Sequence, residues 1–190
     1  MAMTDVMLDI ETTGCGDQLP IDNIGVIQIA AIKFSHDTGE IGETFNRCLS
    51  MAPNRGWEEG TREWWHKRRA ILQSIIARME DPSVVMEDFI AFSLRDAPYG
   101  GYRFWSKPTS FDFPLIASYC RQFGYRMPYH FRIARDLNTY TAAKKGGADH
   151  VDLDHITIDA PEHDALNDCV LQLKRLFAAR DKLFGEVLPA

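Results

Sequence analysis

The chain has 190 residues, 45% of them hydrophobic, which is enough apolar material for one buried core. Its 21 basic and 27 acidic residues give a formal net charge of −6, which argues against a protein that grips long nucleic acid by bulk positive charge. A site that uses bound metal to attract phosphate remains compatible with this charge.

Cysteine spacing and hydropathy add further expectations. The four cysteines, Cys15, Cys48, Cys120 and Cys169, lack C-x-x-C spacing, and the sequence contains neither a signal peptide nor a long apolar span. We therefore expect free thiols, a cytoplasmic location and no membrane partner. Because no repeat, low-complexity tract or linker rich in Pro, Gly or Ser interrupts the chain, we expect a single domain over residues 1–190.

The first strands are expected to form an antiparallel meander. Apolar runs predict buried strands over Val6–Ile10 and Gly25–Phe34, separated by a loop at Cys15–Asn23. A hairpin turn at His36–Gly39 leads to a return strand over Glu43–Leu49.

Two helices are expected next. The spacing of apolar residues predicts an amphipathic helix from Thr61 to about Met79, and Glu80–Ser83 interrupts it. A second helix is expected over Val84–Arg95.

The second half of the chain alternates strands with helices, which is typical of a parallel arrangement. A strand over Tyr102–Ser106 is followed directly by a helix that Gly124 ends, and another strand is expected over Arg132–Leu137. A short helix near Thr139–Lys144 and a last helix from near His163 to about residue 183 complete the chain. The expected fold is therefore α/β, with a mixed sheet of about five strands flanked by helices.

Two carboxylates stand at the end of the first strand. Asp9 and Glu11 are two residues apart, so on an extended backbone their side chains point to the same side and can converge on one cation. Thr12, Thr13 and Gly14 then end the strand, and glycine lets a substrate backbone come close.

Asp112 is the next candidate, and it has two compatible interpretations. As the N-cap of a helix with Pro114 in its first turn, it would contribute about 1 kcal/mol of stability. Alternatively, it stands at the carboxyl end of a strand parallel to the first, where open α/β sheets bind their ligands.

The start of the last helix supplies a third group of polar residues. Asp168 lies beside an apolar stripe, where a carboxylate is costly without a compensating cation or hydrogen bond. Five residues turn a helix through about 140° net, so His163 should lie at or before the first turn if it is to share a site with Asp168. By spacing alone, Asp164 and Asp168 form an equally good pair, and helix geometry leaves this choice open.

These residues resemble the DEDDh class of 3′-to-5′ exonucleases, a ribonuclease-H-like family that includes ribonuclease T and proofreading exonuclease subunits. The resemblance is carried by Asp9-Ile10-Glu11, by Asp112 after a strand, and by His163 with Asp168 five residues later. Further runs are similar to a subgroup of bacterial and phage proteins, some named exodeoxyribonuclease VIII and others acting on RNA. Those runs are Ile24–Ala30, Thr61–Trp65 and Arg135–Thr139.

The resemblance implies a catalytic site with two divalent cations, Mg²⁺ or Mn²⁺, since carboxylate oxygens select hard cations. It assigns Asp9, Glu11, Asp112 and Asp168 as the metal ligands and His163 as the general base. The implied reaction is hydrolysis of the terminal phosphodiester, which releases nucleoside 5′-monophosphates by a two-metal mechanism. On this resemblance, Asp164 is expected to be the local acid at the helix start rather than a ligand.

The resemblance also implies substrate contacts. Thr12, Thr13 and Gly14 are expected to meet the terminal nucleotide, and Phe111 to stack on a base. At least half of the four aromatic residues Phe111, Trp64, Trp65 and Trp105 are expected to be ordinary core. The basic run at Lys67–Arg69 fits either phosphate contacts or, more often, a solvated helix face.

The leading hypothesis is a metal-dependent 3′-to-5′ exonuclease acting on single-stranded RNA or DNA 3′ ends, with the choice of polymer left open. One alternative is a catalytically weak nucleic-acid-binding module of the same fold. Another is an interaction protein in which the helix with two tryptophans serves assembly. Homodimerisation is expected from the relatives.

Overall fold

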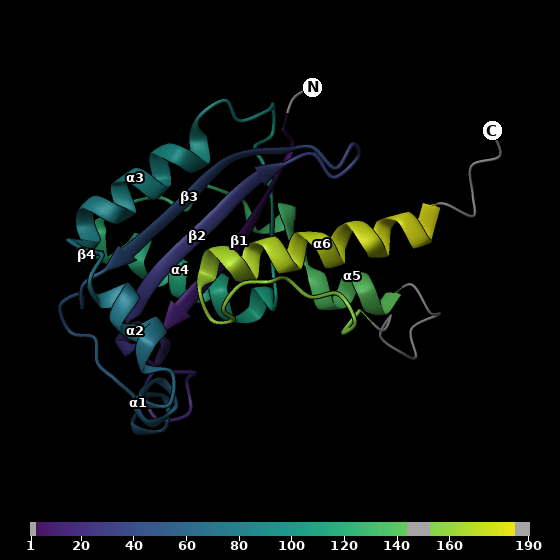
Figure 1. Ribbon diagram of the computed structural model, residues 1–190. Coiled ribbons are helices and arrows are strands. Elements are labelled where there is room, and N and C mark those ends of the chain that lie inside the picture. Colours follow the sequence, from purple (N-terminus) through teal and green to yellow (C-terminus); the bar gives the residue numbers. More distant parts are fainter. Residues whose placement is uncertain (1–2, 144–152, 185–190) are drawn as a thin grey trace.

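A six-stranded mixed sheet forms the centre of the computed structural model, which describes residues 3–143 and 153–184 (Figure 1). The strand order is β4-β3-β2-β1-β5-β6. The strands are β1 (Asp5–Thr12), β2 (Val26–Phe34), β3 (Ile41–Leu49), β4 (Met79–Glu80), β5 (Arg103–Ser106) and β6 (Ala134–Asp136). The α-helices are α1 (Glu59–His66), α2 (Arg69–Ile76), α3 (Pro82–Leu94), α4 (Thr109–Phe123), α5 (Leu137–Ala143) and α6 (Ala165–Phe184).

The expected mixed sheet is confirmed. β1, β2 and β3 pair antiparallel, while β5 lies parallel to β1 and β6 parallel to β5. The sixth strand, β4, was not expected because its two residues are too few for a sequence pattern; it pairs with the end of β3. β6 is shorter than the predicted strand, and α5 begins at once after it.

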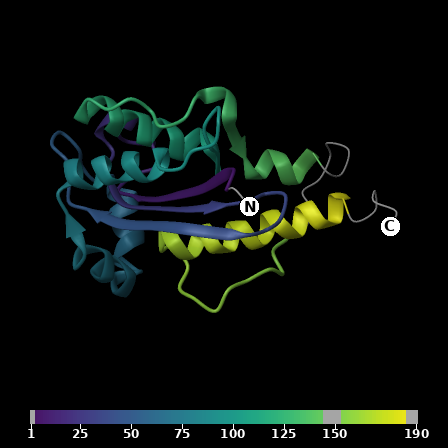
Figure 2. The same ribbon diagram turned by 90° about the horizontal axis from the view of Figure 1, so that it is seen from above.

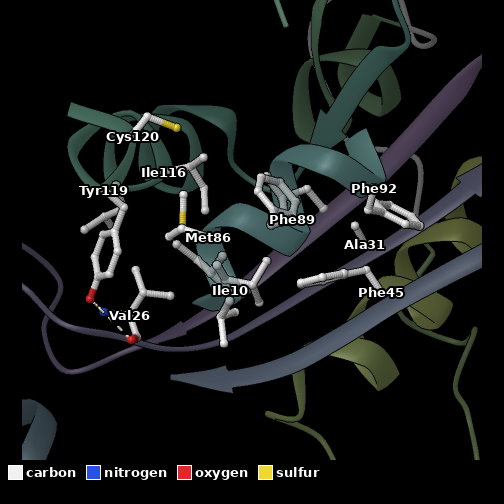
Figure 3. Close-up of a cluster of buried hydrophobic side chains, with 14 of the residues drawn as sticks. Ile10, Val26, Ala31, Phe45, Met86, Phe89, Phe92, Ile116, Tyr119 and Cys120 are labelled. Atoms are coloured by element: carbon white, nitrogen blue, oxygen red, sulfur yellow. Dashed lines mark hydrogen bonds between the residues drawn. The ribbon is translucent and has the colours of Figure 1, made fainter. Parts of the chain in front are cut away.

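Alternating side chains of β1 face two different layers. Val6, Leu8 and Ile10 join the larger core beneath α3 and α4, where aromatic and aliphatic side chains interlock (Figure 3). Met7 joins a second cluster beneath α6. Figure 2 shows α6 on one side of the sheet and the teal to green helices α3 and α4 on the other. Asp9 shares the face of Met7, so the carboxylates of β1 point towards α6.

The prediction of one continuous helix from Thr61 to Met79 is wrong, because α1 and α2 are separate helices that meet at Lys67 and Arg68. Trp65 and Ile75 both pack in the same small cluster with Ile27 and Cys48. On one straight helix these two side chains would stand about 15 Å apart along the axis. The break therefore lets both helices bury their apolar faces against the same part of the sheet.

Local sequence signals set the other helix ends. Asp81 caps α3 by accepting a hydrogen bond from the main-chain N–H of Ser83 at 2.8 Å, with Pro82 in the first turn. Gly124 ends α4 in a left-handed conformation with φ 76°, as the sequence predicts. α6 begins at Ala165. Throughout residues 3–143 and 153–184, no helix has the length and apolarity required to cross a membrane.

Asp5, at the amino end of β1, organises a buried polar cluster away from the carboxyl end of that strand. Its carboxylate accepts hydrogen bonds from Arg103 at 2.8 and 2.6 Å and from the indole N–H of Trp105 at 2.8 Å. The hydroxyl of Thr4 donates a further bond at 2.6 Å. These bonds tie β1 to β5.

We expect Asp5→Ala to lower the free energy of unfolding by about 2 to 3 kcal/mol, because the buried indole N–H of Trp105 loses its acceptor. Chemical denaturation measures the change. The matched control is Asp22→Ala, which breaks an ion pair with Arg121 that is exposed on both sides and should cost less than about 1 kcal/mol. Equal losses in the two variants would contradict a special role for the buried pair.

Candidate active site

Four carboxylates converge where β1 ends. Figure 1 shows α1 and the start of α6 at this end of the sheet. Asp9 and Glu11 are both buried. Burial raises the pKa of Asp9 well above its ordinary value, and the neighbouring charges of Asp112, Glu11 and Asp168 add to the rise. Burial and the charge of Asp168 raise the pKa of Glu11 to about 8.

Asp112 joins this group from the first turn of α4, directly after β5. The interpretation of Asp112 as an N-cap is wrong, since the helix begins at Thr109 and its cap position is Pro108. The side chain is 3% exposed, and burial raises its pKa to about 7 although main-chain hydrogen bonds oppose the rise. The parallel strand therefore delivers this carboxylate to the end of β1, as the second interpretation expected.

His163 and Asp168 complete the arrangement. His163 lies before the first turn of α6, as the helix geometry required, and its main-chain N–H donates to Asp168 Oδ2 at 3.2 Å. One potential ligand atom from each of Glu11, His163 and Asp168 lies within 4.8 Å of the other two. Burial raises the pKa of Asp168, although the charge of His163 lowers it.

Asp164 has a different task at the same helix end. Its Oδ1 accepts from the main-chain N–H groups of Leu166 and Asn167 at 3.2 and 3.4 Å, as a capping carboxylate does. Its Oδ2 accepts from Gln28 at 3.1 Å and from Arg78 at 3.3 Å. The geometry thus favours Asp168 over Asp164 as the carboxylate beside Glu11, a choice that spacing left open.

Gln172 is a site residue that the sequence reasoning missed. It lies one helical turn after Asp168, and its Nε2 donates to Asp9 Oδ1 at 2.7 Å. The side chain is buried, and among the residues that the structure describes its Oε1 has no hydrogen-bond partner. The sequence feature that could have indicated this role is a polar glutamine between two apolar residues, Leu171 and Leu173.

A cavity of about 460 Å³ opens beside Glu11. Three of the four predicted substrate-binding residues, Thr12, Gly14 and Phe111, line it. Its other lining residues are Ile10, Cys15, Asp17, Gln18, Glu58, Gly60, Thr61, Trp64 and Trp65.

Thr13, the fourth predicted substrate contact, does not line the cavity. Its buried hydroxyl donates to the carbonyl of Gly56 at 2.6 Å and accepts from the N–H of Gly25 at 2.7 Å. Its main-chain N–H and carbonyl bond to Gly25 and Glu58. Thr13 therefore supports the cavity wall instead of facing into it.

Glu58 holds the loop that follows β1 and was also missed from the sequence. Its buried carboxylate accepts hydrogen bonds of 2.9 to 3.1 Å from the main-chain N–H groups of Cys15, Gly16, Gln18 and Leu19. Burial opposes ionisation, but these bonds prevail and lower its pKa to about 2. A Cβ at position 14 would approach the Glu58 side chain to 2.8 Å, so glycine there is required by close packing.

The tryptophans divide as expected. Trp65 and Trp105 are buried, and Trp65 donates its indole N–H to the carbonyl of Thr12 at 2.8 Å. Trp64 lines the cavity. In the basic run, Arg68 lies over the Trp64 ring at 3.7 Å, while Lys67 and Arg69 are exposed.

The donor set fits divalent cations. The raised pKa values show that ionising these buried carboxylates together is unfavourable, and a nearby positive charge would relieve their repulsion. Oxygen donors suit Mg²⁺ or Mn²⁺ better than softer metals. Asp9, Glu11, Asp112 and Asp168 are the residues that could hold such ions.

Comparison with known proteins also points to a nuclease. Residues 4–179 match the family model of the 3′-5′ exoribonuclease Rv2179c-like domain. Among curated proteins, none matches the chain.

Solved structures share the fold. Pop2p of S. pombe in its Mg²⁺- and Mn²⁺-bound form has a TM-score of 0.71 at 14% identity, over 98% of this chain and 86% of that one. The zinc-bound complex of E. coli exonuclease I with single-stranded DNA has a TM-score of 0.69 at 18% identity, over 98% of this chain. This chain spans 43% of the length of that enzyme. The nuclease domain of 3′hExo, a DEDDh family member bound to rAMP, has a TM-score of 0.60 at 17% identity, with 97% and 94% coverage. The fold is therefore ribonuclease-H-like.

Without metal, the protein should lose stability as the pH rises. Glu11 and Asp112 have folded-state pKa values of about 8 and about 7, so the folded state keeps protons that the unfolded chain releases from about pH 4 upward. In EDTA we expect the melting temperature to fall between pH 5.5 and 8.5, and Mg²⁺ or Mn²⁺ to restore it most at the higher pH.

Calorimetric melting of Glu11→Gln should show a smaller fall over the same pH range, because one buried charge is gone. Glu87→Gln, which removes an exposed carboxylate from α3, is the control and should follow the parent protein. A melting temperature in EDTA that does not change with pH would contradict the electrostatic account.

Gln172→Ala should weaken divalent-cation binding by about 10- to 100-fold, because Asp9 loses the partner that orients it. Titration calorimetry with Mn²⁺ measures the affinity. Gln73→Ala, an exposed glutamine on α2, serves as the control. Unchanged affinity in Gln172→Ala would show that Asp9 is oriented without this bond.

Proposed function

The chain belongs to the family of Rv2179c-like 3′-5′ exoribonuclease domains, and from this premise we propose that it shortens single-stranded RNA from the 3′ end. It is a metal-dependent 3′-to-5′ exonuclease with a nucleic-acid substrate. One observation carries the proposal: a buried carboxylate cluster and a histidine stand at the edge of an open cavity of about 460 Å³.

We propose that Asp9, Glu11, Asp112 and Asp168 together hold two divalent cations, Mg²⁺ or Mn²⁺. The convergence of the four carboxylates and their raised pKa values support this assignment. When bound, the cations would activate the attacking water and stabilise the departing 3′ oxygen. Gln172 would orient the Asp9 carboxylate through the hydrogen bond that its side chain donates.

His163 is proposed as the general base that takes the proton of the attacking water. Its ring is 35% exposed, which leaves it accessible to water, and the Asp168 carboxylate accepts a bond from its main-chain N–H. Imidazole suits proton transfer near neutral pH. The product would be a nucleoside 5′-monophosphate.

The terminal nucleotide is proposed to enter the cavity beside Glu11. Thr12 and Gly14 would face its backbone, and Phe111 would stack on a base, a contact worth about 1 to 3 kcal/mol in single-strand binders. Thr13 would act only by supporting the wall, since its hydroxyl is engaged with Gly25 and Gly56.

The family description favours RNA over DNA as the substrate. Discrimination between the polymers would depend on the ribose 2′-hydroxyl. Membership of a family of enzymes favours the exonuclease over the two alternatives, a binding module and an assembly protein.

Domain extent, location and assembly state complete the proposal. We propose one exonuclease domain over residues 1–190, a cytoplasmic location and homodimerisation. A monomeric mass in light scattering at micromolar concentration would contradict the dimer.

Asp168→Asn should reduce mononucleotide release at least about 100-fold, more than the loss of an outer-shell partner would. Its matched control is Asp164→Asn on the same helix end, which should keep activity within the same order of magnitude because asparagine caps helices as well as aspartate. The assay uses 5′-labelled single-stranded RNA and DNA of one sequence, with Mg²⁺, Mn²⁺ or EDTA.

Stepwise shortening from the 3′ end that needs metal and is faster on RNA is the expected result. Equal rates on RNA and DNA would contradict the substrate preference. If the folded protein shortened neither polymer, the proposed site would be wrong.

A further inference from the structure

Trp64 stands between the histidine of the site and a guanidinium group. Its ring meets the ring of His163 edge-to-face, with centroids 4.6 Å apart and an interplanar angle of 78°. The guanidinium of Arg68 lies over the Trp64 ring at 3.7 Å and donates to the Trp64 carbonyl at 3.3 Å. The indole therefore has neighbours that fix its orientation.

The helix that carries Trp64 is itself anchored to the end of β1. The adjacent Trp65 is 1% exposed and donates its indole N–H to the carbonyl of Thr12 at 2.8 Å. The rings of Trp64 and Trp65 meet edge-to-face at 5.0 Å and 89°. Because Thr12 directly follows Glu11, α1 presents Trp64 at a fixed position relative to the carboxylates.

His163 needs such support more than the carboxylates do. It precedes α6 and has a left-handed backbone with φ 64°, which is uncommon for a residue other than glycine. Its main-chain N–H is bonded to Asp168, but its ring projects from a turn and is 35% exposed. Its Nε2 lies 4.0 Å from the Glu162 carboxylate, and one of its ring nitrogens lies within 4.8 Å of carboxylate oxygens of Glu11 and Asp168.

We propose that Trp64 is a positioning residue that holds the imidazole of His163 in its working orientation, with Arg68 holding Trp64. This inference rests on the proposed role of His163 as general base. A base misplaced by about 1 Å can cost about 100-fold in rate, so a ring that keeps the imidazole in place would raise kcat. Trp64 acts through His163 and not on the reacting atoms.

A competing role follows from the cavity, because Trp64 also lines it and could stack on a nucleotide base. The two roles differ in their dependence on His163. A base-stacking residue would contribute to substrate binding whether or not His163 is present. A positioning residue has nothing to position once the imidazole is removed.

The experiment is a double-mutant cycle with the full chain, measuring kcat and KM on single-stranded RNA for Trp64→Leu, His163→Ala and the double variant. Trp64→Leu should lower kcat by about 10- to 100-fold with little change in KM. In the His163→Ala background, the same change should lower kcat by less than about twofold. Trp64→Phe retains an aromatic face and should recover most of kcat.

Two further variants keep the result interpretable. Arg68→Gln removes the guanidinium that lies over the Trp64 ring and should lower kcat by a smaller factor than Trp64→Leu. Trp57→Leu, a partly buried tryptophan outside the cavity, controls for the general loss of an indole. If Trp64→Leu does not fold, Trp64→Phe and Arg68→Gln still measure the dependence of kcat on this ring.

Equal losses from Trp64→Leu in both backgrounds, or a rise in KM alone, would overturn the positioning role and leave the proposed function intact. Full activity in His163→Ala would instead contradict the proposed general base. The two failures are therefore distinguishable in one set of measurements.

Discussion

Repulsion among buried carboxylates is the constraint on which the rest of this structure depends. Burial raises the pKa values of Asp9, Glu11 and Asp112, and the charges of neighbouring carboxylates add to the rise at Asp9 and Glu11, so the folded chain holds acidic groups in an unfavourable state. Such an arrangement persists only when surrounding structure holds it in place. Bound cations would relieve the same repulsion, so under the proposed function the cost of the cluster in stability and its use as a metal site have one origin.

The scaffold holds this cluster through rigid neighbours on every side. The central strand β1 is buried along its whole length, and its alternating side chains place the carboxylates beneath α6. At its amino end, Asp5 ties the strand to β5 through Arg103 and Trp105. The carboxylates at the two ends of β1 thus differ in their surroundings. Asp5 is paired with guanidinium and indole N–H donors, whereas Asp9 and Glu11 lie beside other carboxylates.

The loop that follows β1 builds one wall of the cavity. The carboxylate of Glu58 gathers four main-chain N–H groups of the loop after β1, and Thr13 bonds to the chain on two further sides. These contacts stiffen the cavity wall in the way that a preorganised site requires. Within α1, Trp65 is buried and bonds to the end of β1, and the neighbouring Trp64 lines the cavity.

The sequence by itself determined the mixed sheet and marked Asp9, Glu11 and Asp112 as candidates for the site, while the family resemblance pointed to His163 and Asp168. Strand periodicity, the hairpin turn, Gly124 and the two-residue spacing of Asp9 and Glu11 are local signals, and local backbone geometry obeys them. The order of the motifs pointed to a family that the comparison then identified.

Only the tertiary structure decided which groups act together. Spacing could not separate Asp164 from Asp168, because residues four apart would share one face if both were helical. In the structure, Asp164 precedes α6, and its bonds to Gln28 and Arg78 made the difference. Gln172 and Glu58 gain their importance from partners more than 35 residues away in sequence, at Asp9 and in the loop after β1. Contacts between distant segments leave no periodic signal in a single sequence, and that is the physical reason these roles could be read only after the chain was folded.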